Sequence, residues 1–197
     1  MNTSQNNSWG GRLFYLVKLN LLFCIFVFFF ISGCSNQSKN TILFDFENDS
    51  ELDLFNWKCG SLFKISDEYK KNGENSLRME FYPSEQIGFS CGRLKDSNWS
   101  KYAFFDFTVY NPSDRKQTLF IRISDSNTDG KRIKAYEREI VFTPGEKTIS
   151  IPLKDLYDSN GRKMNLNKIL GFYIYSKNKN SKEIFYFDYF RLYNLIK

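Results

Sequence analysis

The chain contains no histidine among its 197 residues, and this absence restricts the chemistry that it could perform. A Ser-His-Asp triad, a Cys-His pair and a His-ligated zinc site each require an imidazole. Carboxylates are numerous, and two of them could in principle flank a glycosidic bond, but no spacing in the sequence selects a pair. The Ser and Lys residues form no recognisable nucleophile motif. We therefore expect a protein that is not an enzyme.

Aromatic side chains offer a different kind of chemistry, because they make up 18% of the chain, with 21 Phe and 12 Tyr. Such rings pack against the C–H faces of sugars, while polar side chains satisfy the sugar hydroxyls. The charge of the chain does not indicate a different polymer as its ligand. The chain has 28 Lys and Arg and 22 Asp and Glu, and it contains no block of basic residues. This mild excess does not indicate nucleic-acid binding.

The first part of the chain has the pattern of an export signal. Arg12 and Lys18 supply positive charge, and no acidic residue precedes Cys34. Residues 21–31 form an unbroken apolar run, shorter than the roughly 20 residues that a membrane-spanning helix needs. This length is typical of the apolar region of a signal peptide.

Cys34 is the candidate for covalent modification. The segment Ile31-Ser32-Gly33-Cys34 resembles the bacterial lipobox, in which small residues precede a cysteine whose thiol receives a diacylglyceryl group. We therefore predict a lipoprotein signal peptide over residues 1–33, lipidation with palmitate-type acyl chains at Cys34, and a polar tether over residues 34–40. The alternatives are an ordinary cleaved signal and an uncleaved anchor, with Cys34 incidental.

A lipid at Cys34 would place the protein in the cell envelope, anchored to a membrane and outside the cytoplasm. Ser35 follows the cysteine. In enteric systems, an aspartate at this position retains lipoproteins at the inner membrane. We therefore favour the outer membrane or the cell surface.

Residues 41–197 read as a series of short strands separated by turns. Turn pairs such as Asn72-Gly73 and Pro144-Gly145 separate runs in which apolar and polar residues alternate. Glycine tolerates positive φ and proline presets the first turn position. Two stretches, 153–157 and 166–170, fit single helical turns. The pattern predicts about eight to ten strands in one all-β domain, a β-sandwich of the jelly-roll type.

The alternation also predicts which side chains face the core. On three strands we expect one set of apolar residues inside: Phe105, Phe107, Val109, Leu119, Ile121, Ile123, Phe172 and Ile174. Their neighbours in sequence then face outward, because side chains alternate between the two faces of a strand.

Several segments, in the same order, resemble the galactose-binding-domain-like jelly rolls, a superfamily that holds many carbohydrate-binding modules. The matching segments span nearly the whole of residues 41–197: Phe44–Asn48 with Trp57, Lys71–Met79, Trp99–Pro112, Pro144–Leu153 and Phe187–Leu192. The resemblance implies a β-sandwich and glycan binding, docking or a purely structural role, because the fold alone does not fix function.

The same resemblance implies a structural calcium site. Members of the superfamily often bind calcium through an acidic residue on the first strand, carbonyl groups of the next hairpin, and an aspartate on the last strand. The matching positions are Glu47, residues 69–72, and Asp188. Calcium needs six to eight oxygen ligands, which two carboxylates, carbonyl groups and water could supply. The alternative is that Asp188 pairs with a Lys or Arg, or lies at a wet strand end.

Cys59 and Cys91 lie in similar strings, Lys58–Leu62 and Ser90–Leu94, that look like strands. Because the compartment outside the cytoplasmic membrane is oxidising, we expect a disulfide between them, with two buried free thiols as the alternative.

The predicted sugar site combines outward-facing residues of three strands. Tyr173 and Tyr175 are two residues apart on one strand, Arg122 faces outward on a second, and Asp106 and Tyr110 on a third. In the related modules the ligand lies across the outer face of one sheet or at its rim loops. Whether these three strands share a sheet stays open at this point, as does an inert or covered face.

The sequence therefore favours a membrane-tethered, extracytoplasmic, carbohydrate-binding-like module without catalytic activity. Its partners would be the membrane and a glycan, and no nucleic acid. The alternative is a structural or docking lipoprotein that binds another envelope protein and has no sugar site. A groove with tyrosines and polar groups would favour the first, and a flat apolar patch the second.

Overall fold

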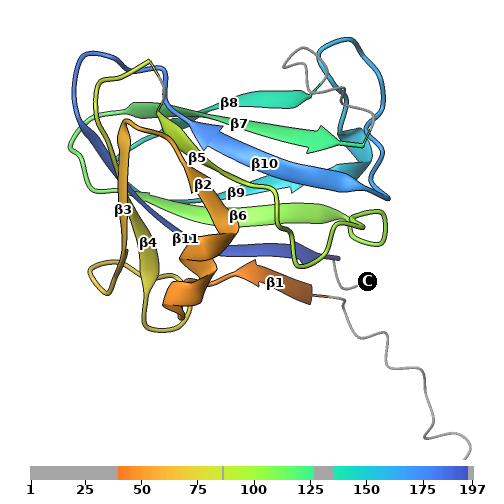
Figure 1. Ribbon diagram of the computed structural model, residues 1–197, viewed down its shortest axis with the longest axis horizontal. Helices are drawn as coiled ribbons and strands as arrows, with labels where there is room; N and C mark the ends of the chain where they lie inside the picture. Colours follow the sequence, from red (N-terminus) through yellow and green to blue (C-terminus); the bar gives the residue numbers. More distant parts are fainter. Residues whose placement is uncertain (1–39, 86, 127–134, 195–197) are drawn as a thin grey trace, which may run out of the picture. The chain divides into compact units, whose positions relative to one another are not determined.

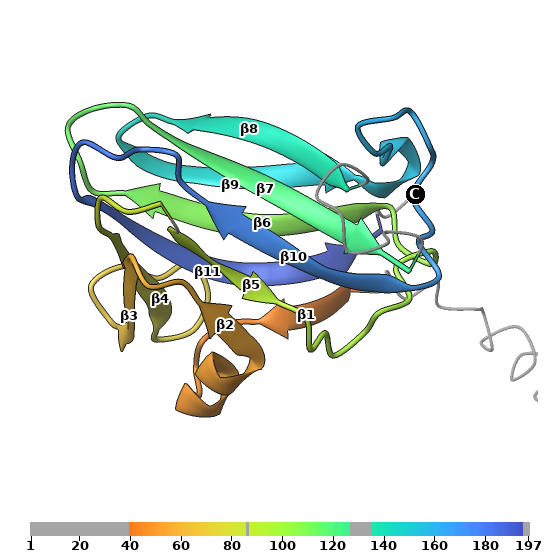
Figure 2. The ribbon, with the colours of Figure 1, turned by 45° about the horizontal axis from the view of Figure 1, so that its top comes forward.

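The computed structural model describes residues 40–85, 87–126 and 135–194. Residues 38–197 form one compact unit, built from two antiparallel sheets that lie face to face (Figures 1 and 2). The predicted all-β sandwich is thus confirmed. Only β3–β4 and β7–β8 among the paired strands follow each other directly in the described chain, so most pairings join distant segments.

The first sheet, which we call sheet A, has β11 near its centre. Its strands in spatial order are β3 (Ser61–Ser66), β4 (Ser76–Phe81), β11 (Glu183–Tyr193), β6 (Phe104–Asn111) and β9 (Gly145–Pro152). Strand β1 (Asn40–Phe44) pairs with the same edge of β11 as β4 does. It pairs with residues 190–193 of β11, whereas β4 pairs with residues 183–187. The register of β11 shifts near Tyr189, whose φ of 54° is in the left-handed region.

The second sheet, sheet B, has β10 at its centre (Figure 1). Its strands in spatial order are β2 (Phe55–Trp57), β5 (Gly88–Cys91), β10 (Ile169–Tyr175), β7 (Gln117–Asp125) and β8 (Tyr136–Phe142). Strand β10 pairs with segments about 50 and 80 positions earlier, so most of this sheet is made of contacts between distant parts of the chain.

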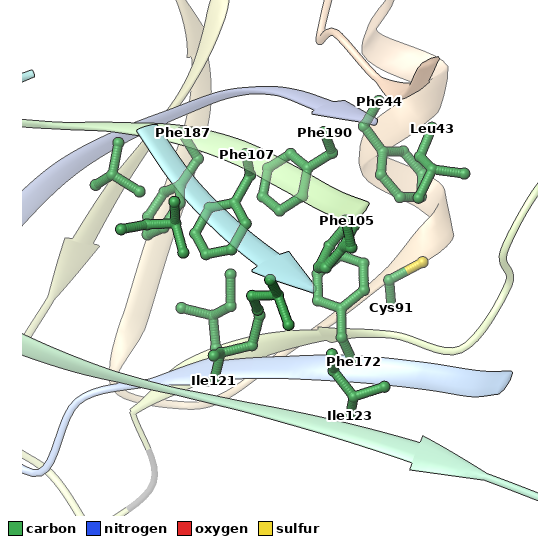
Figure 3. Packing of buried hydrophobic residues seen from close by; sticks show 14 of the residues in the cluster. Leu43, Phe44, Cys91, Phe105, Phe107, Ile121, Ile123, Phe172, Phe187 and Phe190 are labelled. Carbon is green, nitrogen blue, oxygen red and sulfur yellow. The ribbon is translucent and has the colours of Figure 1, made fainter. Parts of the chain in front are cut away.

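Aromatic rings from both sheets fill the core. Phe190 of sheet A stacks on Phe107 at 5.1 Å between ring centroids and on Phe172 of sheet B at 5.4 Å (Figure 3). All eight predicted core residues are at most 3% exposed, which confirms the inward set. Burial of such large apolar side chains is the main stabilising contribution to a sandwich of this kind.

Two short 3₁₀ helices complete the described elements. The helix η3 (Leu153–Asp155) confirms the first predicted helical turn. The second prediction, over 166–170, is wrong as a helix: the N–H of Lys168 binds Asn165 in a single turn, and Ile169 already begins β10. The helix η1 (Asp49–Leu54) was not predicted; Asn48 caps it by accepting the N–H of Ser50.

The predicted disulfide is wrong, since Cys59 and Cys91 are both free thiols. Cys91 is buried and lies opposite Phe55 at one end of β5, as its position against the core in Figure 3 also shows. Cys59 follows Lys58, whose N–H binds Gly88 at the other end of that strand. Three residues of strand separate the two ends by about 10 Å, beyond the roughly 7 Å that a disulfide allows between Cα atoms.

Candidate functional site

The outer face of sheet B carries the residues that the alternation placed away from the core. Tyr173 pairs in register with Arg122 on β7, and Tyr175 pairs with Phe120. On the other side of β10, Tyr173 lies opposite Ser90. The structure thus brings together three of the predicted site residues, Tyr173, Tyr175 and Arg122, and adds Phe120, which was not among the predicted site residues.

The three rings of this face stand in a row. Tyr173 and Tyr175 are stacked with 4.8 Å between centroids and 10° between planes, and Phe120 stacks on Tyr175 at 5.3 Å and 24°. Because the rings pack on one another, the ring faces in contact are covered. Tyr175, in the middle, is only 9% exposed, whereas Tyr173 and Phe120 are half-buried.

A glycine makes room for this row. Gly88, opposite Tyr175 on β5, has φ +137°, and a Cβ there would lie 2.7 Å from the Cβ of Tyr175. A side chain at this position would displace Tyr175 and strain the backbone, so the row depends on the glycine.

An ion pair anchors the polar end of the row. Arg122 donates from Nε to Oε2 of Glu137 on β8 at 2.9 Å and from Nη2 to the Tyr175 hydroxyl at 3.3 Å. Burial and the hydrogen bond to Glu137 raise the pKa of Tyr175 to about 12. Partial burial opposes ionisation of Glu137, but the hydrogen bonds from Arg122 and Tyr175 and the nearby cations lower its pKa overall. At neutral pH the pair is therefore charged and the tyrosine is not.

Lysines lie at both ends of the row. Lys177 Nζ is 3.7 Å from the ring centroid of Phe120, and Lys58 Nζ is 5.9 Å from that of Tyr173. The guanidinium of Arg122 is 5.4 Å from the Tyr175 centroid. Such cation–π contacts keep positive charge next to the rings. The face therefore combines aromatic surface, fixed hydrogen-bonding groups and cations.

The remaining two predicted sugar-site residues lie elsewhere. Asp106 and Tyr110 are on β6, in sheet A, so they do not share a face with Tyr173. Asp106 is buried and paired with Arg191 at 3.2 Å, and Tyr110 stacks on Tyr69 at 4.4 Å. The prediction grouped them with Tyr173 as outward residues and left open whether their strands share a sheet, because alternation shows the face of a strand but not the sheet that holds the strand.

The two carboxylates predicted to bind calcium lie against the loop between β3 and β4. Oδ2 of Asp188 accepts the N–H groups of Lys71 and Asn72 at 2.6 and 2.9 Å. Oε1 of Glu47 accepts those of Glu74 and Asn75, both at 2.9 Å. Burial raises the pKa of Asp188 to about 6, with nearby Glu47 adding to the effect.

Asp188 Oδ2 and Glu47 Oε1 each accept two N–H groups, and Asp188 Oδ1 accepts that of Tyr189 at 2.6 Å. The calcium site at Glu47, residues 69–72 and Asp188, which would need six to eight oxygen ligands, stays a prediction. Within the ranges that the structure describes, no group of three or more His, Cys, Asp or Glu residues could hold a metal ion. In this structure Glu47 and Asp188 fix the loop through its backbone.

Sequence reasoning missed one polar cluster, at the end of β7. Asp125 is fully buried and receives two hydrogen bonds from Arg162, at 2.8 and 3.1 Å, while Arg162 Nε binds Asp158 at 2.9 Å. The N–H of Asn165 also donates to Asp125. These bonds hold the loop between η3 and β10 against sheet B. An aspartate at an inward position of an alternating strand was the available signal, since a buried carboxylate needs a partner.

Cys34, the predicted lipidation site, lies outside the described residues, as do the predicted signal peptide and most of the tether. Among the residues that are described, no helix has the length and apolar character required to cross a membrane.

Comparison with known proteins gives a fold but no family. No protein-family model matches the chain, and no curated protein sequence does either. Solved structures do match. One is a family 11 carbohydrate-binding module from Clostridium thermocellum in complex with a β-1,3-1,4-mixed-linked tetrasaccharide, with a TM-score of 0.62 and 19% identity. The match covers 83% of this chain and 99% of that module.

Two further matches are parts of larger glycan-active enzymes. An exo-β-agarase matches with a TM-score of 0.60 and 17% identity over 77% of this chain and 24% of the enzyme. The CBM22-1 and GH10 modules of xylanase 10B from Clostridium thermocellum, complexed with xylohexaose, match with a TM-score of 0.53 and 15% identity. This match covers 81% of this chain and 29% of that chain. At these identities the likeness shows the fold, which is that of carbohydrate-binding jelly rolls.

Proposed function

We propose that this protein is a non-catalytic carbohydrate-binding module, tethered to the outside of a bacterial membrane by a lipid on Cys34. The observation that carries the proposal is the row of Tyr173, Tyr175 and Phe120 on the outer face of sheet B, beside the Arg122–Glu137 pair. Aromatic rings next to fixed hydrogen-bonding groups are the combination that sugar recognition uses.

In this proposal the half-buried rings and the polar groups have separate roles. Tyr173 and Phe120 supply apolar contact to sugar C–H groups. Arg122 and Glu137 are held by each other, so they can bind hydroxyls without first losing side-chain freedom. Tyr175 supports the other two rings from the middle of the row and its hydroxyl keeps Arg122 in place.

Glycan binding can be tested with the full-length protein solubilised in a non-ionic detergent and applied to an array of plant, algal and bacterial glycans. We expect retention of at least one glycan class. Tyr173→Ala and Phe120→Ala should each weaken that binding by roughly tenfold or more, as expected when a central aromatic contact is truncated.

A matched control is Tyr157→Ala, because Tyr157 is 48% exposed and lies in the loop after η3. This variant should bind like the wild type. Melting temperatures should accompany each titration, so that loss of binding is separated from loss of folding. If no glycan is retained while the protein is folded, the proposal is wrong and the face must be considered for protein docking.

A further inference from the structure

We infer that the glycan bound by the outer face of sheet B is anionic, carrying carboxylate or sulfate groups. The inference rests on the proposed function and concerns the class of ligand. It comes from the charges that lie beside the aromatic row, and specifically from Lys58 and Lys177 at its two ends.

Lys58 and Lys177 are the cations at the ends of the row that can pair with an anionic ligand. In the part of the chain that the structure describes, neither Lys58 nor Lys177 forms an ion pair, whereas Arg122 is neutralised by Glu137. Lys177 also lies near enough to Glu137 to lower the pKa of that carboxylate, although burial opposes the change. Two cations, Arg122 and Lys177, thus lie near Glu137.

The rest of the face adds one carboxylate, so the three cations Lys58, Lys177 and Arg122 exceed the carboxylates of the face by one. Glu139, which pairs in register with Phe120, is the other carboxylate that the strand alternation places on this face. Ser90 and Asn56, on β5 and β2, are neutral. By contrast, two lysines in loops next to strands of sheet A are paired: Lys71 with Glu146 at 2.5 Å and Lys182 with Glu80 at 2.5 Å.

The position of the lysines matters as much as their number. Each ammonium group lies over or beside a ring that would contact sugar, so it is placed to meet a charged substituent of the same sugar chain. Two cations at opposite ends of the row favour a polymer with repeated negative charges over a single charged terminal sugar. Electrostatic complementarity of this kind mainly decides specificity and the rate of association.

The test compares polygalacturonate, chondroitin sulfate and neutral mixed-linkage β-glucan as ligands of the full-length, detergent-solubilised protein. Isothermal titration at low and high salt reports the affinities. We expect tighter binding of one or both anionic polymers than of the glucan, weakened by salt because salt screens exposed charges. Comparison of the two anionic polymers separates carboxylate from sulfate recognition.

The decisive variant is Lys58→Gln with Lys177→Gln. Each exposed pair is worth roughly two- to fivefold in affinity, so the double variant should lose about tenfold for the anionic polymer. The control, Lys64→Gln with Lys154→Gln, removes the same charge from positions that are 57% and 82% exposed and lie off sheet B. It should change the affinity by less than twofold, and both double variants should melt near the wild type.

Three results would overturn the inference. Equal losses of affinity in the two double variants would show that the anionic polymer is attracted only by the net charge of the protein. Binding of the neutral glucan with no preference for the anionic polymers would reject the anionic ligand and leave the proposed function standing. Absence of binding to every glycan would reject the proposed function itself.

Discussion

Tyrosines on the outer faces of both sheets are fixed by ion pairs at their hydroxyl ends. Tyr175 contacts the Arg122–Glu137 pair, and on sheet A the hydroxyl of Tyr186 contacts Glu68 and accepts from Arg78. Burial raises the pKa of both tyrosines. An outward tyrosine of this protein is therefore a positioned ring, and its orientation depends on the charges around it.

Two of the three tryptophans, Trp57 and Trp99, lie in the described part of the chain and should contribute differently to stability. Trp99 is fully buried and packs on Phe105, while Trp57 is half-buried and stacks on Phe63. We expect Trp99→Ala to lower the free energy of unfolding by about 3–5 kcal/mol, because it leaves a large cavity. Trp57→Ala should cost clearly less. Urea denaturation of both variants measures the difference, and equal losses would show that the tryptophan environments are not those described.

Glu80 should make the stability of the protein depend on pH. Hydrogen bonds from Lys182 and Tyr82, with the charge of Arg78, lower the pKa of Glu80 to about 2 from an ordinary value of 4.5. A carboxylate with a lowered folded-state pKa stabilises the fold above its unfolded pKa and loses that effect as the pH falls. The stability gap between wild type and Glu80→Gln should thus be constant near neutrality and close between pH 4.5 and 2.

Chemical denaturation across this pH range tests the expectation. Glu85→Gln is a suitable comparison, because the Glu85 side chain is 83% exposed. Its gap to the wild type should be small at every pH. A gap for Glu80→Gln that does not change with pH would mean that the carboxylate makes no net contribution in the folded state.

At the scale of the element, the loop between β3 and β4 depends on side chains from distant strands. Asp188 comes from β11 and Glu47 follows β1, and both bind backbone N–H groups of the loop. The loop lies on the sheet A side of the molecule, away from the aromatic row of sheet B. The conformation of this loop therefore depends in part on side chains that lie outside it.

Asp188→Ala should lower the free energy of unfolding by about 2 kcal/mol, because it leaves the N–H groups of Lys71 and Asn72 without their acceptor. Thermal melting with and without EGTA distinguishes this role from calcium binding. The hydrogen-bonded arrangement predicts no effect of EGTA on the wild type. A lower melting temperature in EGTA that is absent in Asp188→Ala would instead establish a resident calcium ion. Asp67→Ala, at an exposed position of the same loop, is the control.

At the scale of the whole molecule, the first described strand, β1, begins at Asn40, the last residue of the predicted tether. We expect Cys34→Ala to release the protein from the membrane fraction or to leave it unprocessed. Several acyl chains anchor a protein stably where one chain binds only marginally.

Labelling with a palmitate analogue, followed by membrane fractionation, measures this outcome. Cys59→Ala provides the control, because Cys59 is an exposed free thiol that should not carry the lipid. Absence of label on the wild-type protein would contradict the predicted anchor. Label that survives in Cys34→Ala would assign the lipid to another position.

The amino-acid sequence by itself determined the class of fold and the inward residues of the main strands. Period-two alternation placed Phe105, Phe172 and their equivalents in the core, and it placed Tyr173 and Tyr175 on one face. Both results need only local information, because the side chains of one strand alternate whatever its neighbours are.

Only the tertiary structure decided which strands share a sheet. It paired β10 with β7 and β5 and assigned β6 to the other sheet, which brought Phe120 and Glu137 to Tyr175 and separated Asp106 and Tyr110 from it. It also placed Cys91 at one end of β5 and Cys59 near the other end, next to Lys58, which binds Gly88. These features depend on pairings between segments far apart in the chain, for which neither alternation nor turn residues carry information, because every strand offers the same backbone hydrogen-bonding groups to any partner.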